Sequence, residues 1–416
     1  PAANSGLDLQ IRWKYPVTAE SLPIRDGFLA RLIVAAGQKL VPRRVQGHLI
    51  LTLPSGRQFE LGRMSSGPSA EIHLKSWQPV WASVRRASVG FCESYMEGHW
   101  ESPDPARVIG FYLQNRDSLD RAARPIFFRS AIDRFRHVLR NNSVKGSRRN
   151  IEAHYDLGND FYRLWLDETM TYSSAWFGAG AVELADAQRA KYRLVLDTLG
   201  LRPDHSLLEI GCGWGGLAEE AMRLGAAVTG VTLSTEQLVH ARARLGDGAD
   251  IRLQDYRDAE GSFDRIASIE MIEAVGESHW GRYFGVLSRR LKPGGVAVLQ
   301  AITIDERHFD GYRAGADFIQ RHIFPGGMLP TREEIRKQAR AAGLDYEHVI
   351  GFGHDYARTL AMWREAFEAQ WPAIANLGFD ERFHRKWRLY LDYCEAGFRH
   401  NAIDVGLFRL TKPGLQ

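Results

Sequence analysis

From residue 205 onward, short apolar runs alternate with amphipathic segments along the chain. This pattern predicts strands at 207–212, 226–233, 250–254, 263–269 and 295–302, with helices between them. Such alternation is typical of a parallel sheet that helices cover on both faces. Two later apolar runs, "DYEHVIGFG" and "GLFRLTKP", predict an antiparallel pair at one edge of the sheet. The fold class is therefore α/β with a Rossmann-like sheet, which binds ligands at the carboxyl ends of its strands.

The first part of the chain has a different pattern. Residues 45–75 alternate apolar and polar positions around Pro, Ser and Gly, which predicts a small antiparallel sheet. The run "GFLARLIVAAGQKLVPRR" predicts either a packed helix or a helix that lies on lipid headgroups. Residues 121–149 are basic with interleaved Phe, as in a solvated linker or a segment that touches anionic phospholipid. We therefore expect a smaller α+β domain at 1–125, a basic linker at 126–150 and a catalytic domain at 151–416.

Charge and cysteine content narrow the class of protein. The 416 residues include 54 basic and 50 acidic side chains, a net charge of +4, so charge indicates no nucleic-acid partner. Three dispersed cysteines argue against a disulfide framework and for a reducing compartment. No apolar run approaches the roughly 18 residues of a spanning helix, and no His/Cys cluster has metal-ligand spacing. We expect a cytoplasmic protein without a metal site, and a solvated helix face at "HRKWR", residues 384–388.

The stretch "LLEIGCGWGG" predicts a strand that ends in a cofactor-binding glycine loop, with Glu209, Gly211 and Gly213 at the turn. Such a loop alone is compatible with NAD, a flavin or S-adenosylmethionine. A dinucleotide site usually has an acid about 20 residues later, where this chain has Thr232. After the third strand, Asp255 and Tyr256 are candidates to hydrogen-bond and stack with an adenine. These features favour S-adenosylmethionine.

An ordered series of motifs resembles the cyclopropane-fatty-acid-phospholipid synthase family, which includes the mycolic acid cyclopropane synthases. The series contains "HYDLGNDFYRLWLDETMTYSSAWF", "LLEIGCGWGG", "VTLSTEQ", "LQDYRD", "FDRIASIEMIEAVG", "LKPGGVAVLQAITI", "FIQRHIFPGGMLP" and "DYARTLAMWREAFE". Residues 86–104 also resemble the additional N-terminal domain of the phospholipid enzymes. Each motif is weak by itself, but the ordered set is highly specific.

The resemblance implies an S-adenosylmethionine-dependent methyltransferase that adds a methylene across the cis double bond of a phospholipid acyl chain and forms a cyclopropane. It implies binding to a phospholipid bilayer with unsaturated acyl chains, peripherally at the inner face of the membrane, and a homodimer. The positions that it assigns to the cofactor pocket are Tyr172, Ser173, Gly211, Gly213, Thr232, Gln237 and Ile269.

Methyl transfer to an alkene leaves a carbocation, so a base must then remove a proton. The resemblance implies a bound bicarbonate as this base, held by Glu273, Tyr356 and the backbone of Ile302. An anion beside Glu273 requires a shared proton. Cyclopropanating members usually have Cys and His near this ion, where the present chain has Ser174 in "YSSA" and Gln300 in "QAI".

These two departures bear on ring closure more than on methyl transfer. A neutral Gln hydrogen-bonds an oxyanion but does not titrate as His does. The alternatives are a related fatty-acyl methyltransferase that leaves a methyl or methylene branch, and a lipid-binding protein with a vestigial site. Glu270, three residues before Glu273, is either its neighbour on a helical face or a cofactor contact.

Overall fold

The computed structural model describes residues 45–62, 67, 69–123 and 157–414. The expected helix at 27–44 and the basic linker at 126–150 lie outside these residues. The described chain forms two compact units, one from the residues before 124 together with 380–400, and one from 157–379 and 401–414. None of the helices in the described parts is long and apolar enough to cross a membrane.

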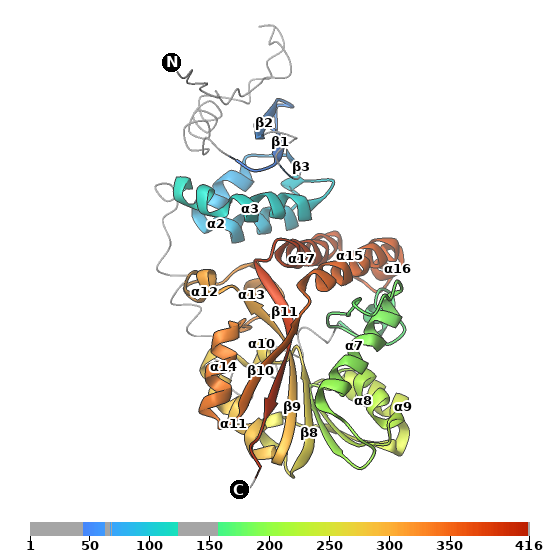
Figure 1. The fold of residues 1–416 in the computed structure, drawn as a ribbon. Coiled ribbons are helices and arrows are strands. Elements are labelled where there is room, and N and C mark those ends of the chain that lie inside the picture. Colours follow the sequence, from blue (N-terminus) through green and yellow to red (C-terminus); the bar gives the residue numbers. More distant parts are fainter. Residues whose placement is uncertain (1–44, 63–66, 68, 124–156, 415–416) are drawn as a thin grey trace, which may run out of the picture. The chain divides into compact units, whose positions relative to one another are not determined.

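The larger unit is built on a seven-stranded sheet with the order β10-β11-β9-β8-β5-β6-β7 (Figure 1). Its strands are β5 (Ser206–Ile210), β6 (Ala227–Thr232), β7 (Ala249–Leu253), β8 (Phe263–Ile269), β9 (Leu291–Ile304), β10 (Asp345–Gly351) and β11 (Ile403–Thr411). Neighbours from β9 to β7 pair in parallel, whereas β11 is antiparallel to both β9 and β10. The predicted α/β sheet and its antiparallel edge pair are confirmed, although β9 also includes the expected "LKPGG" turn.

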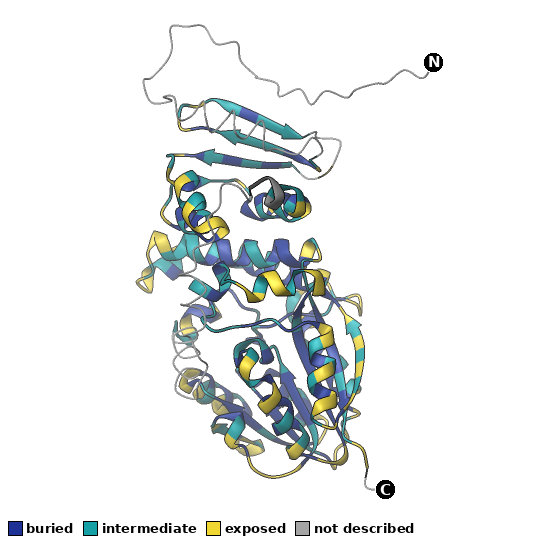
Figure 2. Cartoon of the chain, turned by 90° about the vertical axis from the view of Figure 1, so that its left-hand side faces the viewer, coloured by how far each residue is buried: buried dark blue, intermediate teal, exposed yellow. Residues whose placement is uncertain are grey.

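Helices cover both faces of this sheet, with α7, α8 and α9 on one side and α11 and α14 on the other (Figure 1). The main helices are α7 (Leu184–Leu199), α8 (Gly216–Arg223), α9 (Thr235–Leu245), α11 (Trp280–Arg290), α14 (Arg332–Ala341) and α15 (Gly353–Ala369). Shorter helices are α6 (Asn159–Arg163), α10 (Ile272–Val275), α12 (Glu306–Arg313), α13 (Phe318–His322) and α16 (Trp371–Asn376). The covered strands form the buried centre of the unit, whereas the outer helix faces are exposed (Figure 2).

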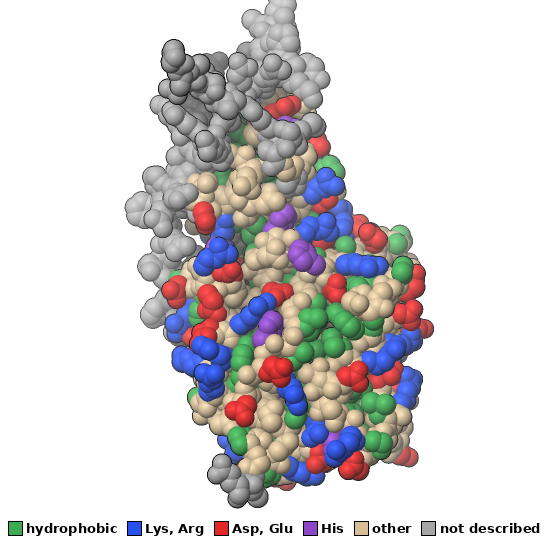
Figure 3. Space-filling model, viewed as in Figure 1, with side chains coloured by type: hydrophobic (Ala, Val, Ile, Leu, Met, Phe, Trp, Pro, Cys, Tyr) green, Lys and Arg blue, Asp and Glu red, His purple; other side chains and the backbone are tan. Residues whose placement is uncertain are grey.

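The apolar stripe of α11 explains how a helix is held on the sheet. Trp280, Tyr283, Phe284 and Leu287 recur at helical spacing and are all at most 1% exposed. They join strand residues such as Ile266 in one continuous core. On the visible face of this larger unit, acidic and basic side chains are interspersed (Figure 3), in keeping with the small net charge.

The smaller unit contains a four-stranded sheet of order β2-β1-β3-β4. Its strands are β1 (His48–Thr52), β2 (Gln58–Gly62), β3 (Ser69–Leu74) and β4 (Trp100–Glu101). The expectation of a purely antiparallel sheet is wrong, because β1 and β3 pair in parallel. After the β1–β2 hairpin, β3 returns to the free edge of β1 and runs in the same direction.

The described residues of the smaller unit also form three helices: α2 (Gln78–Met96), α3 (Pro105–Ala123) and α17 (Glu381–Arg399). α17 packs on α2 and α3, although the boundaries expected from the sequence leave it in the catalytic domain. The solvated face expected at 384–388 is wrong, since Trp387 is 2% exposed. In the same run, Arg385 pairs with Glu101 at 3.1 Å.

The buried stripe of α11 gives a stability prediction. Leu287→Ala removes a fully buried side chain and leaves a cavity, so we expect a loss of about 2–5 kcal/mol in the free energy of unfolding. Leu377→Ala is the matched control, because Leu377 is 47% exposed and its truncation should cost well under 1 kcal/mol. Chemical denaturation measures both, and equal losses would contradict the assigned core.

Candidate active site

The glycine loop after β5 leaves space at the end of the strand. Gly211 and Gly213 have φ angles of 80° and 52°, which favour glycine. The amides of Gly211 and Cys212 donate to the carbonyl of Val231 at 3.0 and 3.1 Å, which ties the loop to β6. A β-carbon on Gly213 would meet no atom within 4 Å. The loop therefore presents open backbone where a ligand can approach closely.

Glu209 precedes this loop and is only 3% exposed. Its Oε2 atom is buried and has no hydrogen-bond partner among the residues that the structure describes. Burial raises the pKa of Glu209 to about 8, although the charge of Lys191 opposes the shift. A buried acceptor without a partner normally indicates a missing water, ion or ligand. Glu209 is thus suited to receive a donor or a positive charge from a bound molecule.

The end of β6 carries a polar pair in place of the acid of dinucleotide sites. The hydroxyl of Thr232 donates to Oε1 of Gln237 at 2.8 Å, and both residues are buried. Ser234 caps α9 by accepting from the amide of Gln237 at 3.3 Å. The structure therefore brings Thr232 and Gln237 together beside the glycine loop, as expected for one pocket.

The two residues proposed for adenine have other partners. Asp255 accepts from Nε and Nη2 of Arg257 at 2.8 and 2.7 Å, and both side chains are 4% exposed. Tyr256 packs edge-on against Tyr283, with ring centroids 5.5 Å apart, and burial raises the pKa of Tyr256 to about 12. The carboxylate of Asp255 serves an internal ion pair, and the ring of Tyr256 is part of the core.

The segment Tyr172–Ser174 joins the cofactor side of the site to a second cluster. The ring of Tyr172 lies 5.3 Å from that of Trp363 and 5.4 Å from that of Tyr162. The carbonyl of Ser173 accepts from Nε2 of Gln188 at 2.9 Å. The next amide, that of Ser174, points to a carboxylate of another element. Consecutive residues therefore face two parts of the site.

Lys191 of α7 is a site residue that the sequence analysis missed. It is 0% exposed, and its Nζ donates to the hydroxyl of Ser173 at 2.7 Å. Burial lowers its pKa to about 8, while the charges of Glu270, Asp167 and Glu209 act in the opposite direction. A lysine in an amphipathic helix usually lies in solvent, so no local pattern in the sequence indicates that Lys191 is buried.

Glu270 is the centre of the second cluster, and the sequence analysis left its role open. Its Oε1 accepts from the amide of Ser174 at 2.8 Å and from Nε2 of Gln300 at 2.7 Å. Its Oε2 accepts from the hydroxyl of Tyr356 at 2.6 Å. Burial raises the pKa of Glu270, and these hydrogen bonds and Lys191 oppose the shift. Three of the predicted catalytic residues thus meet at this carboxylate.

The backbone of Glu270 is held in an uncommon conformation. Its φ is 48°, in the left-handed region that favours glycine, and a non-glycine residue there costs on the order of 1–3 kcal/mol. Its amide donates to the carbonyl of Gln300 at 2.8 Å. This bond continues the pairing of Ile269 with Gln300 between β8 and β9.

Glu273 lies three residues further along the chain, in the short helix α10. Its Oε1 accepts from the amide of Ile302 at 2.5 Å, whereas its buried Oε2 has no hydrogen-bond partner within the described part of the chain. Burial raises the pKa of Glu273 to about 8, and the negative charge of Glu270 raises it further. Glu270 has three donors and Glu273 has one, so the proton of this pair resides on Glu273 at neutral pH.

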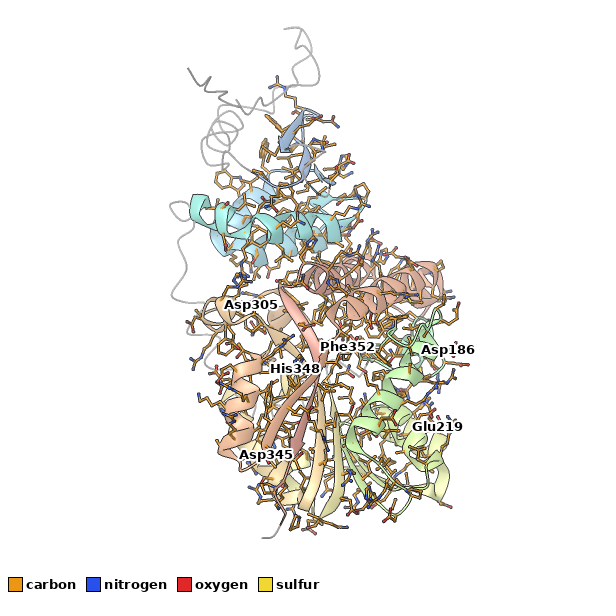
Figure 4. The ribbon with its side chains drawn as sticks, in the orientation of Figure 1. Asp186, Glu219, Asp305, Asp345, His348 and Phe352 are labelled. Carbon is orange, nitrogen blue, oxygen red and sulfur yellow. The ribbon has the colours of Figure 1, made fainter. Side chains whose placement is uncertain are left out.

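A cavity of about 670 Å³ opens at the carboxyl ends of β9 and β10. Figure 4 labels Asp345 and His348 within β10 and Phe352 directly after it. It also labels Asp305, directly after β9. Asp305, Phe352 and Asp355 line the cavity. Asp355 also accepts from the amide of Phe177 at 2.8 Å, which anchors the segment after Ser174 to α15.

These observations fit S-adenosylmethionine. The open glycine loop, the Thr232–Gln237 pair and the unpartnered oxygen of Glu209 lie at the carboxyl ends of β5 and β6, where such sheets bind ligands. A buried carboxylate suits a cosubstrate that carries positive charge. The fold and the site therefore define the class: an S-adenosylmethionine-dependent methyltransferase.

Comparison with known proteins gives the family. The family model described as mycolic acid cyclopropane synthetase matches residues 142–408, and the chain belongs to this family. The chain is 38% identical over 420 residues to the tuberculostearic acid methyltransferase UfaA1 of Mycobacterium tuberculosis, covering 96% of both chains. It is 36% identical over 351 residues to the cyclopropane-fatty-acyl-phospholipid synthase of Escherichia coli, covering 82% of this chain and 87% of that protein.

A solved structure supports the cofactor. The mycolic acid cyclopropane synthase CmaA1 complexed with SAH and CTAB matches with a TM-score of 0.60 and 34% identity. It covers 64% of this chain and 98% of that chain. The fold class expected from the sequence, the resemblance to this family and the expected cosubstrate are thus confirmed.

The buried ammonium group gives a binding prediction. Lys191→Met removes the donor to Ser173 and the charge that favours the ionised form of Glu209, so we expect S-adenosylmethionine affinity to fall about tenfold or more, roughly 1.4 kcal/mol. Isothermal titration calorimetry measures this affinity. Lys337→Met is the control, because Lys337 is 68% exposed and pairs with Glu334 on the surface. Unchanged affinity in Lys191→Met would contradict the role of Lys191.

The raised pKa of Glu273 gives a pH prediction. The folded state keeps a proton on Glu273 up to about pH 8, whereas the unfolded chain releases it near pH 4.5. Stability is therefore lost as pH rises through this window. We expect Glu273→Gln to gain stability relative to the wild type between pH 5.5 and 7.5, on the order of 1 kcal/mol.

Urea denaturation at both pH values measures this gain. Glu333→Gln is the control, because Arg336 holds the pKa of Glu333 below its ordinary value. Glu333 therefore stays ionised over this pH range, and its contribution to stability should not change between the two pH values. A constant difference between Glu273→Gln and the wild type would contradict the assigned proton.

Proposed function

We propose that the protein transfers the methyl group of S-adenosylmethionine to the cis double bond of unsaturated acyl chains in phospholipids. The resulting acyl cation then loses a proton and closes to a cyclopropane. The observation that carries the proposal is the segment Tyr172–Ser174, which joins the cofactor side to a buried carboxylate cluster. This reaction requires a methyl donor and a base on either side of the position that the double bond of the acyl chain occupies.

Bound S-adenosylmethionine supplies an electrophilic methyl group. Gly211 and Gly213 admit the cosubstrate, Glu209 offers an acceptor, and Thr232 with Gln237 offers hydroxyl and amide groups. Tyr172, Trp363 and Tyr356 place aromatic rings beside the cluster. Aromatic faces stabilise a cation on the acyl chain by cation–π attraction, and a lining poor in water protects that cation from hydrolysis.

Two similarities support a phospholipid substrate. The match to the Escherichia coli phospholipid enzyme covers 82% of this chain, whereas the match to CmaA1 covers 64% of it and nearly all of CmaA1. The longer match therefore extends beyond the catalytic region. We assign the smaller unit, with α2, α3 and α17, to binding of the bilayer surface.

A methylene-branched product is a second candidate, and Ser174 and Gln300 favour it. After methyl transfer to one alkene carbon, the cation lies on the other carbon. Loss of a methyl proton with bonding to that carbon closes the ring. If hydride first shifts between the two carbons, the charge moves to the carbon that bears the methyl group, and loss of a methyl proton gives a methylene branch on the open chain instead. The relative UfaA1, a methyltransferase by name, matches this chain over 96% of its length.

Lipid analysis tests the proposal. The full-length protein is incubated with S-adenosylmethionine and vesicles of a cis-monounsaturated phosphatidylglycerol, and the released fatty acids are examined by proton NMR. We expect loss of olefinic signals and new upfield signals of ring methylene protons. Vinylidene signals would instead establish the methylene branch, and the absence of any S-adenosylmethionine-dependent product would contradict both. The mass alone does not decide, because the two products are isomers.

A further inference from the structure

We propose that the carboxylate of Glu270 is the base that removes the proton from the acyl cation, in the place where the resemblance implies a bicarbonate ion. This inference rests on the proposed function above. It gives Glu270 a catalytic role. It also means that the enzyme needs no bicarbonate, because its own carboxylate occupies this position.

The hydrogen bonds of Glu270 are the first argument. The groups expected to hold bicarbonate include Ser174, Gln300 and Tyr356, and all three donate to Glu270, at 2.8, 2.7 and 2.6 Å. A second oxyanion would have to share these donors and would lie against a carboxylate of like charge. The residues present therefore do not fit a bound bicarbonate, and the side chain of Glu270 takes its place.

The number of donors also identifies the atom that can act. An ionised carboxylate has about four lone-pair sites. Oε1 of Glu270 accepts two hydrogen bonds, from Ser174 and Gln300, whereas Oε2 accepts only the one from Tyr356. Oε2 thus retains a lone pair that can receive a proton, and the other bonds hold the carboxylate in a fixed orientation.

The backbone conformation is the second, independent argument. Glu270 has a φ of 48°, where glycine would be unstrained. Strain of this kind clusters at functional sites, because surrounding structure must enforce it. Here the hydrogen bond from the amide of Glu270 to the carbonyl of Gln300 enforces the strained conformation. The carboxylate, rather than the backbone turn, accounts for the presence of a non-glycine residue at this position.

Three hydrogen bonds and one positive charge favour the ionised form of the base. Lys191 and the three hydrogen bonds counteract the effect of burial on the pKa of Glu270. The second carboxyl, Glu273, has a pKa of about 8 and is mainly neutral at pH 7. Glu270 is therefore the charged member of the pair and the stronger hydrogen-bond acceptor.

Methyl transfer breaks the carbon–sulfur bond, forms a carbon–carbon bond and leaves one positive charge on the acyl chain. The carboxylate of Glu270 takes a proton from a carbon–hydrogen bond of the new methyl group. The electron pair of that bond forms the ring bond, or the double bond of a methylene branch, and neutralises the cation. Glu270 then returns its proton to water after the product leaves.

The test compares the wild type, Glu270→Gly and Asn401→Gly in carbon-dioxide-free buffer, with and without added bicarbonate. Glycine relieves the positive φ, so the first variant should fold and open the oxyanion site. We expect wild-type turnover to be independent of bicarbonate. Glu270→Gly should lose at least about 100-fold in turnover and recover at least tenfold with bicarbonate. Asn401→Gly, an exposed residue with a φ of 55°, is the control for glycine itself and should match the wild type.

A second measurement does not depend on turnover. Carbon-13 NMR of labelled bicarbonate should show line broadening by Glu270→Gly but not by the wild type. Wild-type turnover that needs bicarbonate, full activity of Glu270→Gly without it, or bicarbonate binding to the wild type would overturn the inference. If the wild type methylates no acyl lipid, the proposed function fails, and the carbon-13 comparison still decides whether Glu270 fills the oxyanion position.

Discussion

The active site depends on the interactions of one buried ammonium group, that of Lys191, with the acidic side chains around it. It is enclosed by protein, donates to Ser173 and balances the carboxylates of Glu270, Asp167 and Glu209. Buried charges are costly unless opposite charges and hydrogen bonds compensate them. Three acidic side chains face one ammonium group, so the site favours a cosubstrate with positive charge. Binding of such a cation would in turn favour the ionised form of Glu209.

The segment after Thr171 transmits this arrangement to the reacting groups. Gln188 and Lys191 of α7 hold Ser173, while Thr359 of α15 accepts from the amide of Ala175 at 3.2 Å. Ser174 lies between these anchors and directs its amide to Glu270. A segment held on both sides has little freedom to move the donor relative to the carboxylate. Such preorganisation is what a site needs to act on a short-lived cation.

The sequence predicted the parts of the molecule that depend on local pattern. The strand–helix alternation and the glycine loop follow from neighbouring residues, and the structure confirms both. The mixed sheet of the smaller unit and the packing of Trp387 were missed, because they depend on contacts distant in sequence. Asp255 was expected to face a cofactor, but Arg257, only two residues further, takes its carboxylate.

Glu270 shows why the candidate site was only partly predictable. Its environment combines a left-handed backbone with donors from Ser174, Gln300 and Tyr356, which are 96, 30 and 86 residues away in sequence. No periodicity in the chain reports such a convergence. The same three donors were predicted as neighbours of a bound anion, so the sequence identified the oxyanion position without identifying the side chain that fills it.

A carboxylate that belongs to the chain differs from a bound ion in ways that bear on the product. It is present at every turnover and requires no recruitment from solution. However, its three hydrogen bonds stabilise the anion and oppose the rise in pKa that burial causes. The weaker the base, the longer the acyl cation persists, and a hydride shift that moves the positive charge to the more substituted carbon then competes with ring closure. The basicity of Oε2 of Glu270 therefore determines whether ring closure or a methylene branch is favoured.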